Sequence, residues 1–262
     1  MTEPAREAPA AYLPAARWSL PQFLFVFGVG LLASFAATVV AVVLQGEGLS
    51  VTAYALIFAS QSAGSLGAMW WLSTTKGSGS LRDDFGLRLE LKDAWALFAG
   101  FGLQIAVALL TAPLVYLFYG DEPPQQQVSE ITGSSHGLAE SVLIVMAIGL
   151  LAPLTEEMMF RGMLLSRAAR SWTRTGAVVA TGAAFAAIHL FDWNTRIFLP
   201  GLFVIGVVLA LAALRRGDLS LAIPIHAGVN LTAALLLLFG DDLARWAEEQ
   251  RQLLEGIVHL FT

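Results

Sequence analysis

Two adjacent carboxylates and an arginine lie within one strongly apolar stretch of the chain, at Glu156, Glu157 and Arg161. Ionisable side chains at membrane depth are costly, and they are therefore interpreted as functional. Glu157 and Arg161 are four residues apart, so on a helix their side chains can form an ion pair. Glu156 points about 100° away from Glu157 on such a helix, and one arginine cannot neutralise two carboxylates. We therefore expect Glu156 to lack an arginine partner and to be able to act as a general base.

Two further polar pairs with helical spacing occur in later apolar segments. His189 follows Phe185 by one helical turn, and Asn230 follows His226 in the same way. A single histidine in an apolar helix is more often a hydrogen-bonded packing residue, and Phe185 is better interpreted as packing than as chemistry. His226 and Asn230 share one helical face, however, so they can direct donors at one point. With a rise of about 1.5 Å per residue, all three helices can place these groups in the inner half of a membrane.

The composition identifies the class of protein to which this cluster would belong. The chain has 262 residues, of which 56% are hydrophobic and only 13% are charged. Soluble domains carry about 25% charged residues, so an integral membrane protein is indicated. The net charge of −5 gives no indication of nucleic-acid binding. The absence of cysteine excludes disulfides, thiolate metal sites and a cysteine nucleophile.

The hydrophobic pattern predicts an all-α, polytopic bundle of about seven transmembrane helices. Inside a membrane, backbone N–H and C=O groups have no water to bind, so they must form their hydrogen bonds within helices. Seven segments approach the roughly 20 apolar residues that a span needs. They are 22–45, 51–74, 94–119, 140–166, 175–192, 197–214 and 219–240. With a cytoplasmic N-terminus, eleven Lys and Arg residues fall on the inner side and three on the outer side. This split follows the positive-inside rule and predicts that the C-terminus lies outside.

The segments between and after these helices suggest a division of the chain. Residues 1–139 would form three N-terminal membrane helices with a cytoplasmic linker at 75–92, and 140–240 a catalytic helical core. The stretch 120–137 is predicted to be a flexible outer loop. The tail 241–262 mixes charged and apolar residues, which predicts an amphipathic helix on the membrane surface.

The order and spacing of the polar motifs resemble the CAAX-protease and bacteriocin-processing (CPBP, or Abi) family of intramembrane proteases. The family pattern is E-E-x-x-x-R, then F-x-x-x-H, then H-x-x-x-N. It is matched here by Glu156-Glu157 with Arg161, by Phe185 with His189, and by His226 with Asn230. The resemblance covers about 140–240. Each motif alone is weak, whereas the ordered set is fairly specific.

The resemblance implies a role for each motif residue in an endopeptidase. Glu156 and His189 would activate the attacking water, and His226 and Asn230 would stabilise the oxyanion. Glu157 and Arg161 would support the architecture of the site. One oxyanion donor is worth about 3–4 kcal/mol, and a His–Asn pair can supply such donors.

A metal ion is an open alternative for the same residues. One glutamate and two histidines can form a three-ligand zinc site with an open position, so Glu156, His189 and His226 are possible zinc ligands. A metal-free site is preferred, because Asn230 on the face of His226 suits a donor pair better than a ligand.

Other functions remain open from the sequence. The polar cluster could instead serve a non-catalytic membrane binding or immunity protein, or line an ion or proton pathway. Expected partners of a protease are membrane lipid and a peptide or membrane-protein substrate, without nucleic acid. The Ala-, Arg- and Leu-rich composition and short loops favour a prokaryotic cell membrane as its location.

Overall fold

The chain forms a helical bundle in a computed structural model, which describes residues 14, 16–46, 48–120, 137–191 and 193–236 and the single positions 239, 245 and 251. The structure is 86% helical, and the described residues include no strand. The predicted all-α fold is therefore confirmed. The predicted outer loop at 120–137 lies, except at its two ends, outside the described residues, as does nearly all of the predicted amphipathic tail at 241–262.

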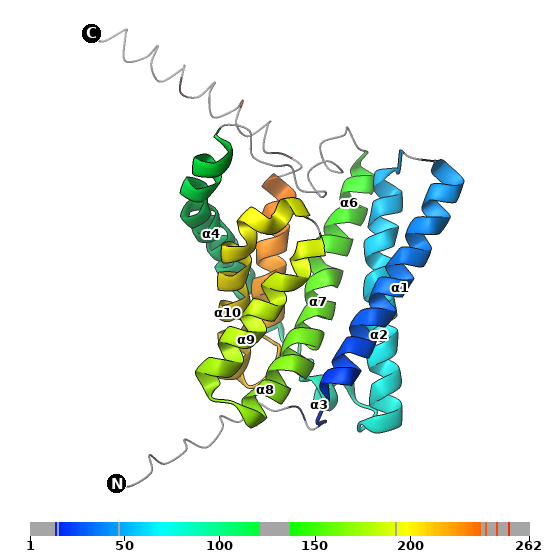
Figure 1. The fold of residues 1–262 in the computed structure, drawn as a ribbon, viewed down its shortest axis with the longest axis vertical. Helices are drawn as coiled ribbons and strands as arrows, with labels where there is room; N and C mark the ends of the chain where they lie inside the picture. The colour runs from blue at the N-terminus through cyan, green and yellow to red at the C-terminus, as the bar shows by residue number, and fades with distance from the viewer. Residues whose placement is uncertain are drawn as a thin grey trace, which may run out of the picture.

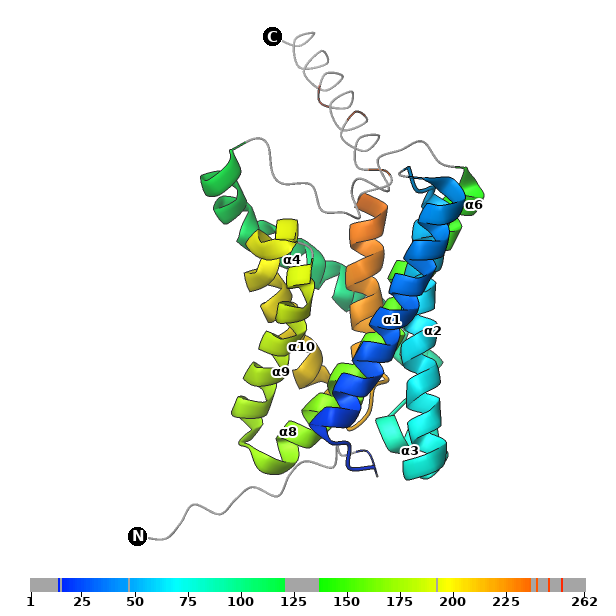
Figure 2. The same ribbon diagram turned by 45° about the vertical axis from the view of Figure 1, so that its right-hand side comes forward.

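The long helices run alternately up and down the bundle (Figures 1 and 2). The N-terminal part contains α1 (Leu20–Gln45), α2 (Val51–Lys76), α3 (Leu81–Phe85), the 3₁₀ turn η1 (Leu91–Asp93) and α4 (Ala96–Tyr119). The next long helix is assembled from α6 (Leu138–Met146), η2 (Ala147–Leu151), α7 (Ala152–Glu157), η3 (Met158–Leu165) and α8 (Ser166–Ser171). The remaining elements are α9 (Arg174–Ile188), η4 (His189–Phe191), η5 (Trp193–Phe198), α10 (Leu199–Arg216) and the helix Ala222–Leu236, called helix 222–236 below.

The apolar helices make the chain a multi-pass membrane protein, but the predicted count of seven spans is not confirmed. Among the described residues, four helices are long and apolar enough to cross a membrane: Leu20–Gln45, Leu91–Tyr119, Leu138–Ser171 and Thr195–Arg216. The second predicted span forms α2, which is long enough, but its Ser, Thr and Gln residues lower its mean hydropathy. The fifth predicted span yields only the 15-residue α9, because the chain turns into 3₁₀ geometry at His189. The described part of the seventh, helix 222–236, is also short.

Glycines allow three pairs of helices to approach closely. Gly30 of α1 lies against Ser65 of α2, so that a Cβ on the glycine would overlap the serine hydroxyl. Gly182 of α9 and Gly206 of α10 meet in the same way, with only 3.0 Å between a Cβ built on Gly206 and the Cα of Gly182. The third pair joins α4 to helix 222–236. Because membrane helices associate through close packing, these contacts fix the helices that carry the polar residues.

The predicted linker at 75–92 is folded against the end of the bundle. The buried Asp84 carboxylate accepts hydrogen bonds from the Ser73 hydroxyl at 2.5 Å and from the Ser78 backbone N–H at 3.0 Å. The backbone carbonyl of Asp84 accepts a bond of 2.7 Å from the Trp18 indole, whose ring stacks on Phe85. The linker thereby connects the residues before α1 to α2 and α3.

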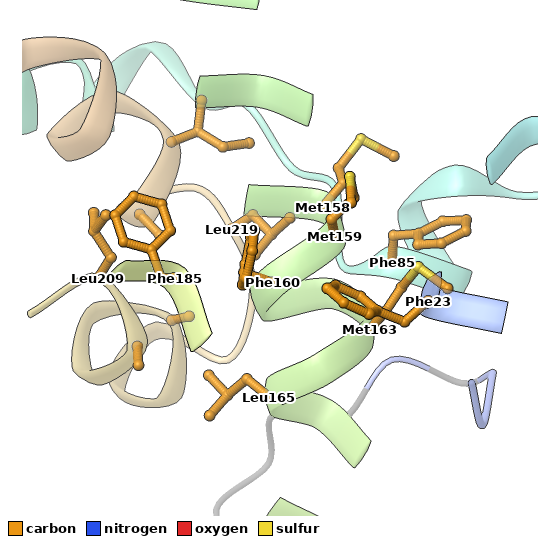
Figure 3. Close-up of a cluster of buried hydrophobic side chains, with 14 of the residues drawn as sticks. Phe23, Phe85, Met158, Met159, Phe160, Met163, Leu165, Phe185, Leu209 and Leu219 are labelled. Carbon is orange, nitrogen blue, oxygen red and sulfur yellow. The ribbon is translucent and has the colours of Figure 1, made fainter. Parts of the chain in front are cut away.

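A cluster of buried apolar side chains surrounds the helix that carries the paired glutamates. Figure 3 shows Phe160 and Met163 of η3 at its centre, with Phe23 and Phe85 on one side and Phe185 on the other. Phe160 meets Phe185 edge to face, with 5.4 Å between ring centroids. Helix α9 is therefore held against η3 by aromatic packing just beside the polar residues.

Candidate active site

Glu157, the last residue of α7, is the most enclosed group of the site. Its side chain is completely buried, and one oxygen, Oε1, accepts a hydrogen bond of 2.9 Å from Arg161. The predicted ion pair one turn apart is therefore present. Arg161 also donates to the backbone carbonyl of Gly206 at 2.9 Å, which ties η3 to α10. Sequence reasoning did not identify Gly206, because no local pattern indicates which backbone carbonyl a buried arginine will reach.

His226 connects the two glutamates. Its Nδ1 lies 2.8 Å from Oε1 of Glu157, and its Nε2 lies 3.7 Å from Oε2 of Glu156. The imidazole is buried, whereas the Glu156 side chain is 26% exposed. Glu156 thus faces an imidazole from another helix and forms no arginine pair among the described contacts. The sequence motifs pair Glu156 with His189 for activation of water, whereas the histidine that the structure places against Glu156 is His226.

Phe185 packs against both histidines. Its ring centroid lies 5.1 Å from that of His189 and 5.4 Å from that of His226. The Arg161 guanidinium lies over the same ring at 4.8 Å, a cation–π contact that adds to the burial of the arginine. The interpretation of Phe185 as a packing residue therefore agrees with its surroundings.

His189 lies where α9 changes into the 3₁₀ turn η4. Its Nδ1 lies 2.9 Å from the backbone carbonyl oxygen of Phe185. A carbonyl oxygen can only accept a hydrogen bond, so Nδ1 carries the proton and Nε2 is the acceptor of the neutral ring. His189 is half-buried.

Asn230 is directed at the backbone of the glutamate helix. Its Nδ2 donates a hydrogen bond of 2.9 Å to the carbonyl oxygen of Ile148. Ile148 belongs to η2, a π-helical turn in which the backbone bonds run to the fifth residue instead of the fourth. An amide nitrogen has two hydrogens, so one N–H of Asn230 remains for another acceptor. The sequence predicted a shared face for His226 and Asn230 but gave no sign of Ile148.

The three possible zinc ligands do not form a metal site in this geometry. No three His, Cys, Asp or Glu side chains among the described residues are grouped so that they could hold a metal ion. Glu156, His189 and His226 are therefore not grouped as the three ligands of a zinc ion in this structure.

Comparison with known proteins finds a family that is similar to the part of the chain carrying the site. Residues 138–232 match the family model described as type II CAAX prenyl endopeptidase Rce1-like. This stretch, called the Rce1-like segment below, covers less than half of the chain. The predicted resemblance to CAAX proteases is thereby confirmed, and the Rce1-like segment contains all seven motif residues, from Glu156 to Asn230.

A similar protein is known from Escherichia coli, where it is described as an uncharacterized 24.3 kDa protein. It is 32% identical over 105 residues, which are 39% of this chain and 46% of that protein. The aligned region therefore spans less than half the length of this relative. No solved structure matches the chain.

Proposed function

We propose that the chain is a membrane-embedded endopeptidase that hydrolyses a peptide bond of a membrane-associated protein or peptide. The observation that carries this proposal is the separation of 3.7 Å between Oε2 of Glu156 and Nε2 of His226. This separation exceeds a direct hydrogen bond, yet a single water oxygen can lie within about 2.8 Å of both atoms. Such a water would have a carboxylate base on one side and an imidazole on the other.

Glu156 is the general base of the proposed reaction. Arg161 pairs with Glu157 instead, and the partial exposure of Glu156 leaves it accessible to water and substrate. Glu157, in contrast, is enclosed by Arg161 and His226 and cannot reach a substrate. A positioned base of this kind contributes roughly 10²–10⁴-fold to the rate.

His189 and Asn230 complete the proposed site. The Nε2 of His189 is the acceptor nitrogen of the neutral ring, because the Phe185 carbonyl keeps the proton on Nδ1, and it would accept a hydrogen bond that orients the attacking water. The remaining N–H of Asn230 would donate to the oxyanion, and its bond to Ile148 would hold the amide in place. These roles are supported by the match to the Rce1-like family.

The decisive experiment compares membrane proteomes of cells that produce the wild-type protein or the Glu156→Gln variant. Loss of hydrolysis should remove a set of new peptide termini that only the wild-type protein generates. Glu140→Gln is the matched control, because Glu140 lies at the far end of the same long helix and contacts Thr52. Equal sets of termini with wild type and Glu156→Gln, at equal protein levels, would contradict the proposal.

The same comparison tests the non-catalytic alternative. The Glu157, Arg161 and His226 contacts join α7, η3, α10 and helix 222–236, so the cluster could simply hold a binding or immunity protein together. A cellular phenotype that survives Glu156→Gln and His189→Ala would favour that function over hydrolysis.

A further inference from the structure

His226 is held between two carboxylates that differ in their surroundings. Glu157 is fully buried, and its Oε1 accepts a hydrogen bond from Arg161. The same Oε1 lies 2.8 Å from the Nδ1 of His226, and because this oxygen is the acceptor of the pair, Nδ1 donates. The proton of the neutral ring is therefore fixed on Nδ1, and Nε2 carries the lone pair.

The nitrogen that carries this lone pair lies near the proposed base, Glu156. The Nε2 of His226 is the ring nitrogen that lies 3.7 Å from Glu156. A buried carboxylate that holds Nδ1–H, and so frees Nε2 for proton transfer, is the arrangement by which hydrolytic triads orient their histidine. Glu157 has the position of that buried carboxylate, and Arg161 anchors it to the Gly206 carbonyl of α10.

We propose, on the basis of the endopeptidase function above, that His226 carries the water-derived proton from Glu156 to the leaving amine and that Glu157 is the residue that positions it. Water attacks the peptide carbonyl carbon, the new C–O bond forms, and the carbonyl electron pair moves to oxygen. One water proton passes to the Glu156 carboxylate and from there to Nε2 of His226. When the intermediate collapses, the C–N bond breaks, and the amine nitrogen takes the proton from Nε2. Glu156 is again ionised, and His226 is again neutral with its proton on Nδ1.

This assignment also explains how His226 can serve the oxyanion. In the neutral ring Nε2 has no hydrogen, so it cannot donate to an oxyanion. Once it has received the proton from Glu156, the ring is an imidazolium with an Nε2–H, which forms when negative charge is present on the intermediate. Stabilisation of that charge then comes from a donor that is present mainly in the transition state.

Nitrogen NMR of the full-length protein in lipid nanodiscs tests the assignment without a substrate. The chain contains four histidines, and the signals of His226 and His189 are identified by their loss in His226→Gln and His189→Gln. At a pH at which the ring is neutral, we expect the His226 proton on Nδ1. Arg161 and the Nδ1 of His226 both contact Oε1 of Glu157, so Glu157→Leu removes the acceptor of Nδ1 and the ring should lose its preference for the Nδ1 proton.

Glu140→Gln should leave the His226 tautomer unchanged. A neutral wild-type ring with its proton on Nε2 would overturn the proposal. This measurement is made on the wild-type protein, and variants are needed only to identify the histidine signals. An unchanged tautomer in a folded Glu157→Leu protein would also overturn it.

Cleavage measurements separate this inference from the proposed function. With a substrate found by the proteome comparison, His226→Gln and Glu157→Leu should each lower turnover roughly 10²–10⁴-fold. If Glu156→Gln abolishes cleavage while a folded Glu157→Leu protein retains the wild-type rate, the proton-carrier role is wrong and the protease function stands. If Glu156→Gln itself retains cleavage, the protease function is wrong.

Discussion

Gly100 of α4 and Gly228 of helix 222–236 lie back to back, with the Cα of Gly228 only 2.9 Å from a Cβ built on Gly100. A side chain on Gly228 would overlap the carbonyl oxygen of Leu97, and one on Gly100 would overlap that of Ile225. Gly228 is two residues from His226. The contact therefore links α4, outside the Rce1-like segment, to the helix that carries the central imidazole.

The first prediction concerns this contact. Gly228→Ala should lower the thermal midpoint in detergent, because overpacking at a rigid backbone contact costs about 1–3 kcal/mol. Gly102→Ala is the control, since Gly102 lies on α4 with nothing within 4 Å of a built Cβ. Equal midpoints for the two variants would show that α4 and helix 222–236 are not packed as described.

The second prediction concerns the buried ion pair. Arg161→Leu should destabilise the protein by about 3–5 kcal/mol, because Glu157 would remain buried without its cation. Adding Glu157→Gln should recover part of this loss, measured by unfolding of the single and double variants. Arg88→Leu provides a control at the half-exposed pair with Asp218, where about 0–1 kcal/mol is expected. A loss for Arg161→Leu as small as that of the control would contradict the burial of the pair.

The third prediction tests the folded linker. Asp84→Ala should destabilise the protein by about 1–3 kcal/mol, because the Ser73 hydroxyl and the Ser78 N–H lose their buried acceptor. The adjacent Asp83→Ala variant is the matched control, since Asp83 is exposed. Proteolysis within 75–92 should become faster for Asp84→Ala and stay unchanged for Asp83→Ala. Similar rates for both would mean that the linker is held by other contacts.

The fourth prediction concerns acid sensitivity at Glu90. The hydrogen bond from Lys92 holds the pKa of Glu90 below its ordinary value, and the charges of Lys92 and Arg216 act in the same direction. Ionised Glu90 therefore favours the folded state above the unfolded pKa, and this contribution disappears as the pH falls through the folded pKa. Glu90→Gln should show a small stability deficit at neutral pH that vanishes in acid. A deficit that grows on acidification would reverse the sign and refute this account.

Features that depend on local spacing could be predicted from the sequence. The pair of Glu157 with Arg161 was predictable because residues four apart meet on any helix. The helical class could be inferred from the length of the apolar segments. The number of spans was harder, because α9 ends where 3₁₀ geometry begins at His189 and because α2 is long but rich in hydroxyl groups.

The relative rotation of the helices was not predictable. Glu157, rather than Glu156, forms the short contact with His226, and Asn230 reaches the Ile148 carbonyl. Both outcomes depend on the turn of one helix about its axis relative to another. That angle is set by tertiary packing and by π-helical turns, for which the local sequence carries no recognised pattern.

The two π-helical turns, Ala147–Leu151 and Met158–Leu165, lie on either side of the paired glutamates. In an uninterrupted α-helix each residue is rotated by about 100° from the one before it, so a π-helical turn changes the direction in which the following side chains point. Deleting a single amino acid inside either turn would convert it to ordinary α-helical geometry. The part of the helix on one side of the turn would then be rotated about the helix axis relative to the part on the other side. Length changes at these two places are therefore expected to be far less tolerable than in surface loops, even though every side chain of the motif would be retained.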